Sequence, residues 1–410
     1  MSKYKQRFFA KINVDYEFGR CEYEGKVRQS GDWPDHIKVE NGNPVRSLDV
    51  RLNKGNILNA VKFKLLIPET RNNLNEILGS VILKELGFIA PETFQVFTKV
   101  NNISNLMIFQ EKSEKELLER NNRREGPIFE GDEDLLWGYK NFSIFELENV
   151  SLSKLLNENW FKKGSNNQII TLKASKKLQV AYLDYIKNHM TSKTVLFPNS
   201  KKNEIFLNYH LLLESMNGYH ALRPHNRQYY YNTFLNIFEP IYYDGMFKLT
   251  KPIERFNQDI YSNLQISEID KYIDLLKNEK IQKRIKEKYN SRTIDDKSNF
   301  LLKSLNQIIA NLENIKNSII SNSEYKIKNF KNNENINHYF DNHKNNEFDQ
   351  FFIHNIKMNN NKYEVEISSL FNDEIFLKNI SSSELAEILS ENKLENKRTV
   401  FLPKNKVSEI

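Results

Sequence analysis

The sequence of 410 residues contains a single cysteine, Cys21, so it can form no internal disulfide bond. For the same reason it cannot build a zinc site of the kind that paired cysteines hold. Arg20 and Lys26 lie near Cys21, but Glu22 and Glu24 stand between them and no histidine is close, so little nearby favours a thiolate. We therefore expect Cys21 to be a structural residue rather than a catalytic nucleophile.

Long apolar runs are also absent, because no run reaches the roughly 18 residues that a membrane-spanning helix needs. Residues 1–18 carry basic side chains but lack the apolar segment of a signal peptide. These absences predict no transmembrane segment. They favour a cytoplasmic location if the chain is complete, with an envelope or secreted location as the alternative if the sequence is part of a longer chain.

The chain is rich in large apolar side chains and carries a net positive charge. Apolar residues make up 39% of it, and 27 Phe and 19 Tyr are enough to help build a folded core. The formal net charge of +7 suits an anionic partner such as a nucleotide. Nucleic acid is not the expected partner, because the basic and aromatic residues Arg223, Arg227, Tyr229 and Tyr231 form no known binding motif.

The first 112 residues are predicted to be a strand-rich lobe. Polar and apolar residues alternate there as in half-buried strands, and one helical pattern over residues 72–87 ends at Gly87. Asn101 and Asn102 predict a hairpin turn. The expected strands cover residues 8–14, 21–27, 47–52, 61–67, 93–100 and 106–110.

The rest of the chain mixes helices and strands, so the fold class is α+β. Residues 113–320 are predicted as a mostly helical lobe, residues 321–346 as an Asn-rich linker, and residues 347–410 as a small β-rich appendage. The expected helices cover residues 113–120, 151–161, 178–189, 204–216, 267–289, 300–320 and 383–389, and two aromatic strands are expected over residues 228–231 and 237–243.

Lys62 and Lys64 lie two residues apart on a predicted strand, so they point to one face of the sheet while Phe63 points into the core. A lysine on a central strand can neutralise nucleotide phosphates, and a carboxylate on the neighbouring helix can hold it in place. Glu76 and Glu85 are the candidates for that carboxylate. The alternative is that both lysines lie on an exposed strand face.

A second candidate segment is the strand predicted over residues 107–112, which leads into a helix. A strand that enters a connecting helix is a common place for an adenine ring, which makes Glu111 a candidate nucleotide-side residue. An ordinary surface position for Glu111 is an equally good interpretation.

A third candidate segment ends at Gly245. Asn226 precedes a pair of predicted strands, and Asp244 follows them. Asn and Asp oxygen atoms suit a hard Mg²⁺ or Mn²⁺ ion, and the glycine allows a sharp backbone turn beside it. The alternative is an ordinary hairpin turn, with His220 and His225 serving only as hydrogen-bonding residues.

These segments occur in an order that resembles the CotH-like family of atypical protein kinases, named for a spore-coat kinase. The resemblance covers residues 27–244, and because each motif is short, the ordered set carries it. It implies a divergent two-lobed kinase-like core that binds ATP and a divalent metal and phosphorylates protein hydroxyl groups. The matching segments are Val27-Arg28-Gln29-Ser30-Gly31-Asp32, residues 48–52 and 62–66, Glu85-Leu86-Gly87, Ala90-Pro91, Val100-Asn101-Asn102, Gln110-Glu111-Lys112 and residues 226–244.

The resemblance also implies roles for single residues. Lys64, with Lys62 as the alternate, corresponds to the phosphate-binding lysine. Asp244 and Asn226 correspond to the metal ligands. Glu111 falls where the family tends to have an acidic residue beside the nucleotide.

One departure from the family pattern concerns the catalytic base. Kinases of this type present an Asp a few residues before the metal-binding Asn, whereas residues 218–225 contain no Asp or Glu. His220 lies at the right distance and can act as a base near neutral pH. The sequence therefore predicts a kinase for a protein or other hydroxyl acceptor, with His220 and Asp244 catalytic. A non-catalytic nucleotide- or partner-binding module is the alternative.

Overall fold

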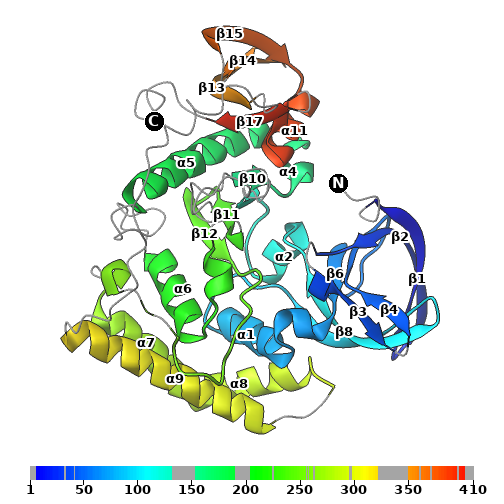
Figure 1. Cartoon of the computed structure of the whole chain (residues 1–410), viewed down its shortest axis with the longest axis vertical. Coiled ribbons are helices and arrows are strands. Elements are labelled where there is room, and N and C mark those ends of the chain that lie inside the picture. The colour runs from blue at the N-terminus through cyan, green and yellow to red at the C-terminus, as the bar shows by residue number, and fades with distance from the viewer. Residues whose placement is uncertain are drawn as a thin grey trace. The chain divides into compact units, whose positions relative to one another are not determined.

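The computed structural model describes most of the chain (Figure 1). His225 and nearly all of the predicted linker lie outside the described residues. The described residues are 6–31, 34–40, 42–131, 153–189, 204–223, 226–254, 256, 258–261, 264–294, 298–321, 350–359, 362–369, 372–394 and 397–401.

The chain divides into two compact units, each assembled from segments that are distant in the sequence. The lobes predicted from the sequence follow one another along the chain, whereas these units interleave, because successive segments pack into different cores. Unit 1 comprises Met1–Arg124, Glu204–Leu222 and Pro240–Tyr325, and unit 2 comprises Glu125–Asn203, Arg223–Glu239 and Lys326–Ile410.

Unit 1 is built on a six-stranded antiparallel sheet with the order β1-β2-β5-β6-β8-β7, drawn in blue and cyan in Figure 1. The predicted hairpin is confirmed, since Asn101 and Asn102 join the last two strands with left-handed φ angles of 48° and 69°. The strands are β1 (Phe8–Tyr16), β2 (Gly19–Gln29), β5 (Leu48–Leu52), β6 (Lys62–Leu66), β7 (Thr93–Val100) and β8 (Ile103–Glu111), and β3 (Ile37–Glu40) pairs with β4 (Asn43–Arg46) in a small separate hairpin.

The two faces of this sheet differ. On one face Phe63 is buried and stacks on the ring of Phe109, which also stacks on Phe94. Phe63 therefore points into a core, as predicted. Lys62 and Lys64 lie on the opposite face, because side chains alternate along a strand.

Helix α1 (Leu74–Glu85) ends where the sequence predicts, since Gly87 beyond it has a left-handed φ of 92°. The helix predicted over residues 113–120 is shorter than expected, α2 (Lys115–Arg120). Two further predicted helices are present as α6 (Glu204–Ser215) and α9 (Ser298–Ser321).

The prediction of one helix over residues 267–289 is wrong. The structure has two helices there, α7 (Ile266–Lys277) and α8 (Glu279–Asn290). Asn278 separates them, because its side chain caps α8 by accepting hydrogen bonds from the backbone N–H groups of Lys280 and Ile281.

A four-stranded sheet with the order β10-β9-β11-β12 is built largely from residues of unit 2. The helix predicted over residues 151–161 is wrong, because its described part starts as strand β10 (Ser153–Leu155), which pairs with β9 (Ile128–Gly131), and only α4 (Glu158–Phe161) is helical. The two aromatic strands are present as β11 (Gln228–Asn232) and β12 (Ile237–Ile241), and a long helix is α5 (Ser165–His189).

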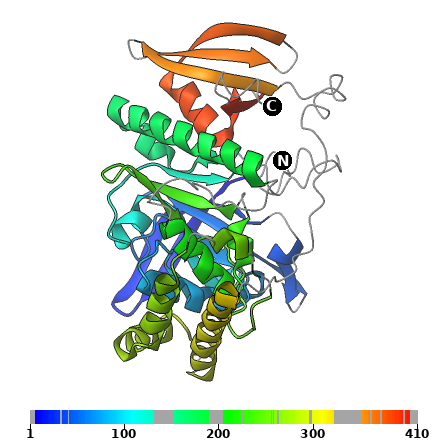
Figure 2. The same ribbon diagram turned by 90° about the vertical axis from the view of Figure 1, so that its left-hand side faces the viewer.

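The C-terminal residues of unit 2 form their own five-stranded sheet with the order β15-β14-β13-β17-β16. It does not stand alone, since the Tyr363 hydroxyl donates a hydrogen bond to the side chain of Gln168 on α5, which runs beside the sheet in Figure 2. The elements are β13 (Gln350–Asn359), β14 (Lys362–Ser369), β15 (Asn372–Ile380), α11 (Ser382–Glu391), β16 (Lys393–Leu394) and β17 (Lys397–Phe401).

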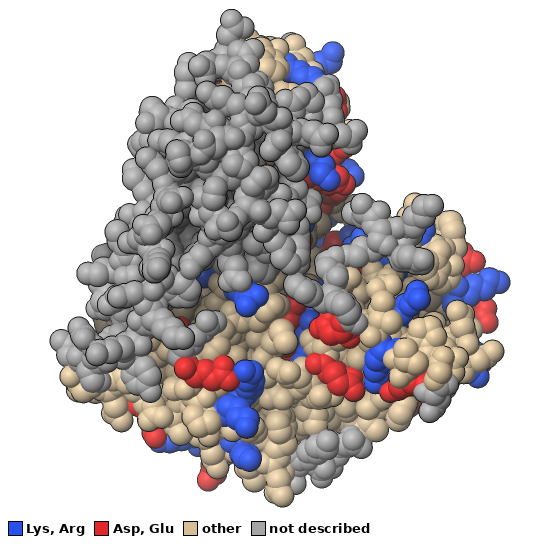
Figure 3. Space-filling model, viewed as in Figure 1, with Lys and Arg blue, Asp and Glu red and all other residues tan. Residues whose placement is uncertain are grey.

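The α+β class predicted from the sequence is confirmed, with helices and largely antiparallel sheets in the same units. Within the described part of the chain, no helix is long and apolar enough to cross a membrane. On the face shown in Figure 3, described basic and acidic side chains lie near one another, so the net charge of +7 is not gathered there into one large basic patch.

Candidate functional site

A polar row crosses the sheet of unit 1 on the face that carries Lys64. Arg28 on β2 is the register partner of Asp49 on β5, and Asp49 is the partner of Lys64 on β6. Lys64 is in turn the partner of Gln110 on β8. Side chains of register partners point to the same face and lie about 5 Å apart. The row therefore places alternating charges beside a lysine at the centre of the sheet.

Lys64 is the residue that connects the sheet to the segment around Asp244. Its Nζ donates a hydrogen bond of 2.7 Å to the Tyr243 hydroxyl and lies 4.9 Å from the centre of that ring. Lys62, the alternate candidate, forms an ion pair with Glu114 instead. Of the two lysines, Lys64 is thus the one that the structure brings to the predicted Asp-Gly segment.

Asp244 is buried and has an unusual backbone. Its φ of 49° is left-handed, a conformation that is costly for a residue with a side chain and that persists where surrounding contacts hold it. Arg71 Nη2 lies 3.0 Å from one carboxylate oxygen, and His220 Nδ1 lies 3.4 Å from the other and 2.9 Å from the backbone oxygen. Burial would raise the pKa of Asp244, but Arg71 and His220 outweigh it and lower the pKa to about 2.

Glu76 on α1 is fully buried behind this segment. One carboxylate oxygen accepts a hydrogen bond of 2.7 Å from Gln110 Nε2, and the other accepts one of 2.6 Å from the Tyr242 hydroxyl. Burial raises the pKa of Glu76 to about 7, although Arg71 and these hydrogen bonds act in the opposite direction. A carboxyl group with this pKa changes its charge near neutral pH.

Glu85, the other candidate partner for Lys64, is occupied elsewhere. It forms ion pairs with Arg284 and Lys288 on α8, and it therefore joins two helices rather than the site. The prediction that Glu85 could hold Lys64 is wrong for this structure.

The segment after β12 is fixed onto the start of α1. Asn72 Nδ2 donates hydrogen bonds to the backbone oxygens of Met246 and Phe247, at 2.9 and 3.1 Å. Gly79 makes room for the Phe247 ring, because a Cβ at this glycine would lie 2.1 Å from a ring carbon. These contacts, with those of Arg71 and Glu76, hold Asp244 in its left-handed conformation.

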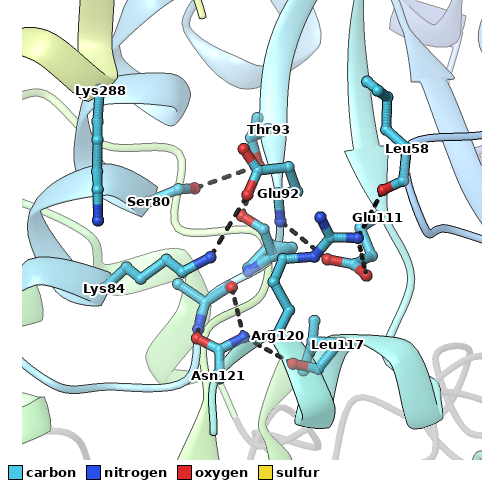
Figure 4. A network of polar contacts seen from close by, with 12 residues as sticks. Leu58, Ser80, Lys84, Glu92, Thr93, Glu111, Leu117, Arg120, Asn121 and Lys288 are labelled. Atoms are coloured by element: carbon cyan, nitrogen blue, oxygen red, sulfur yellow. Dashed lines mark hydrogen bonds and ion pairs between the residues drawn. The ribbon is translucent and has the colours of Figure 1, made fainter.

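Glu111 is not brought to this group. Its register partner is Phe63, so its side chain lies on the other face of the sheet from Lys64. One carboxylate oxygen lies 3.2 Å from Arg120 Nη2 on α2, and the other accepts a hydrogen bond from the backbone N–H of Glu92, as Figure 4 shows. These contacts tie the strand to the following helix, which is a structural arrangement.

Asn226 belongs to unit 2, whereas Asp244 belongs to unit 1. It is buried, and its backbone N–H donates a hydrogen bond of 2.9 Å to the carbonyl of Arg223 just before β11. The convergence of Asn226 with Asp244 therefore stays a prediction.

The described residues of unit 1 do not fit a resident divalent metal as they stand. Nowhere in the described ranges do three or more His, Cys, Asp or Glu side chains gather as a metal-binding group. At Asp244 the position of a cation is taken by Arg71, whose side chain is buried together with the carboxylate. A protein guanidinium, rather than a bound ion, neutralises Asp244 in this arrangement.

Sequence reasoning missed several residues of the group. Gln110 could have been found, because the Asn101 and Asn102 turn fixes the pairing of the last two strands and thus which side chains share a face. Arg71 carried no signal, since its burial beside Asp244 depends on how two distant segments pack. Arg71 Nε is buried without a hydrogen-bond partner among the described residues.

Comparison with protein-family models and with curated proteins finds no match for this chain.

Proposed function

We propose that the chain is a phosphotransferase with a divergent kinase-like core, which transfers the γ-phosphate of ATP to a protein or other hydroxyl acceptor. The observation that supports this most is the approach of Lys64, on a central strand, to the Tyr243–Asp244 segment, which is about 180 residues away in sequence. A lysine and a carboxylate brought together beside a buried glutamate are the kind of group that positions a phosphate chain. ATP would enter as its divalent-metal complex, so the metal is part of the substrate.

In this proposal Lys64 binds phosphate oxygens, and the Tyr243 hydroxyl holds its ammonium group in place when no phosphate is bound. Glu76, held by Gln110 and Tyr242, keeps α1 and the Asp244 segment in register. Phosphoryl transfer depends mainly on such positioning and on neutralising charge, so few groups need to take part chemically.

His220 is the proposed base. Its Nδ1 faces Asp244, which holds the imidazole ring in place, and an imidazole can take a proton near neutral pH. The acceptor oxygen attacks the γ-phosphorus, the bond from that phosphorus to the β–γ bridging oxygen breaks, and ADP leaves. The acceptor's proton passes to the imidazole of His220.

A non-catalytic nucleotide-binding module on the same core is the second candidate. The pairing of Asp244 with the buried Arg71 favours it, because a carboxylate already neutralised by the protein is a poor ligand for an incoming cation. Such a module would bind ATP through Lys64 without transferring phosphate.

Calorimetric titration with ATP and Mg²⁺, followed by a transfer assay with labelled ATP, tests the proposal. Lys64→Met should weaken ATP binding by about tenfold or more, because a charge-assisted hydrogen bond is lost. Lys99→Met is the matched control, since Lys99 is an exposed lysine of the same sheet, and it should bind like the unaltered chain. ATP binding without transfer to any acceptor would support the non-catalytic module. Equal binding by both variants would contradict the proposal.

A further inference from the structure

Three cationic side chains surround one carboxylate next to Lys64. The side chain of Asp49 on β5 is only 3% exposed. Its carboxylate oxygens lie 3.2 Å from each of three nitrogen atoms, Arg7 Nη2, Arg28 Nη2 and Lys112 Nζ. These four residues come from before β1, from β2, from β5 and from the end of β8. The cluster therefore gathers positive charge from three segments around one carboxylate.

The cluster is open to solvent on its cationic side. The side chains of Arg7, Arg28 and Lys112 are 29%, 34% and 29% exposed, whereas the carboxylate beneath them is buried. Within these contacts one negative charge is set against three positive ones. Cations held close together repel one another, and an anion that enters between them relieves this repulsion.

The position of the cluster in the sheet indicates which kind of ligand it would bind. Arg28, Asp49 and Lys64 are successive register partners on one face, so Arg28 lies two strands from Lys64, at a spacing of about 10 Å. Guanidinium groups suit phosphate oxygens because they present several N–H donors in one plane. A molecule with phosphate oxygens at Lys64 and a further anionic group can reach both points.

We propose that Arg7 and Arg28, gathered over Asp49, form a second anion-binding site that receives a phosphate group of the molecule bound at Lys64 or of a second substrate beside it. Asp49 acts as the positioning residue that holds both guanidinium groups in place. The site is an addition to the proposed phosphate contact of Lys64, and it concerns binding rather than transfer.

A purely structural ion cluster is the competing explanation. It accounts for the burial of Asp49, but it does not require that the arginine side chains remain one-third exposed. The two explanations differ in what happens when the carboxylate is neutralised. In Asp49→Asn the amide oxygen can still accept a hydrogen bond from a guanidinium group, but the competing negative charge is gone. The variant should therefore bind anions more strongly if the cations serve a ligand, whereas a structural cluster would lose stability without any gain in binding.

The test is calorimetric titration of the full chain with inorganic tripolyphosphate and, separately, with ATP. Arg7→Gln and Arg28→Gln should each weaken tripolyphosphate binding by about tenfold, because each removes a charge-assisted contact. Arg20→Gln is the matched control, since Arg20 lies on the same hairpin, is 62% exposed and pairs only distantly with Asp15, at 3.7 Å. It should bind tripolyphosphate like the unaltered chain.

The two titrations separate the sources of the anion. A parallel loss of ATP affinity in the arginine variants assigns the site to the nucleotide's own phosphates, and an unchanged ATP affinity assigns it to a phosphate of the second substrate. If Arg28→Gln does not fold, Arg28→Lys and Arg7→Gln replace it in the test of anion binding. The first keeps the positive charge at its position, and the second removes it. The site is overturned if the unaltered chain does not bind tripolyphosphate, or if both arginine variants bind it as tightly as the unaltered chain does. Loss of ATP binding in Lys64→Met alone would then leave the proposed function standing.

Discussion

Lys64 acts electrostatically on two carboxylates, Asp49 and Asp244, and the protein keeps them ionised in different ways. Asp244 and its partner Arg71 are buried together, with side chains 10% and 6% exposed. At Asp49 only the carboxylate is buried, and its partners Arg7 and Arg28 are about one-third exposed. The pKa of each carboxyl group is lowered by these cations despite burial.

The difference separates a closed pair from an open one. Inside a closed pair the charges cancel away from water, so either partner left alone is costly. In an open cluster the cations can return to water or bind another anion, so the loss of the carboxylate costs less. We therefore infer that Asp244 holds the shape of the site, whereas Asp49 leaves positive charge available at the surface of the sheet.

Asp244→Asn should have the largest effect on stability. It keeps the shape of the side chain but leaves the buried Arg71 guanidinium without its countercharge, and breaking a buried pair costs about 3–5 kcal/mol. Urea unfolding measures this loss. Arg71→Met combined with Asp244→Asn should recover part of it, because no unpaired charge is left inside. If Asp244→Asn alone lowers the free energy of unfolding by less than about 1 kcal/mol, the Arg71–Asp244 pair is not shielded from water as a closed pair is.

The pH dependence of the same pair has a definite sign. The pKa of Asp244 is about 2 in the folded chain, below the value of about 3.9 expected for an unfolded one. Its contribution to stability is therefore complete above about pH 4 and is lost as the pH falls toward 2. Asp244→Asn should therefore lose less stability than the unaltered chain does when the pH falls from about 4 toward 2.

Glu76→Gln should give the next largest effect, with the opposite pH dependence. Burial raises the pKa of Glu76 to about 7, so the folded chain retains a proton that the unfolded chain releases, and stability falls as the pH rises from about 4.5 to 7. The variant should remove up to about 3 kcal/mol of this decline. Thermal unfolding at pH 5 and pH 8 measures it.

The hydrogen bonds of Glu76 can survive that substitution. Gln110 Oε1 has no partner among the described residues, so the Gln110 amide can turn over and accept a hydrogen bond from the new side chain. An unchanged slope of stability against pH in Glu76→Gln would show that Glu76 stays ionised throughout and would remove it as the source of the decline.

Asp49→Asn should have the smallest effect on stability. The arginines beside it are partly exposed and can be solvated, so we expect a loss of about 1–2 kcal/mol, which added salt should reduce. Urea unfolding at low and high salt measures it beside Asp244→Asn. Equal losses in the two variants, with the same salt dependence, would remove the distinction between an open and a closed cluster.

The sequence was most informative where structure is local. Alternation placed Lys64 on the face opposite Phe63, and the two asparagines at positions 101 and 102 gave the hairpin, because both depend only on residues close in sequence. The break at Asn278 was missed, because its side-chain cap competes with an apolar pattern that runs through both helices.

The site was only partly predictable for a related reason. Lys64, Glu76, Asp244 and His220 were named from residue type and order, and the structure groups them in unit 1. Arg71 was not named, because nothing near it in sequence shows that it will be buried against Asp244. Glu111 was named from its position after a strand, but strand pairing turns it to the other face.

The most direct test of the account is a crystal structure of the full chain with a non-hydrolysable ATP analogue and Mg²⁺. The account predicts phosphate oxygens within about 3 Å of Lys64 Nζ, in place of its contact with the Tyr243 hydroxyl. An analogue bound with its phosphates away from Lys64, and with the Lys64–Tyr243 contact intact, would contradict the central claim that these segments meet to bind phosphate.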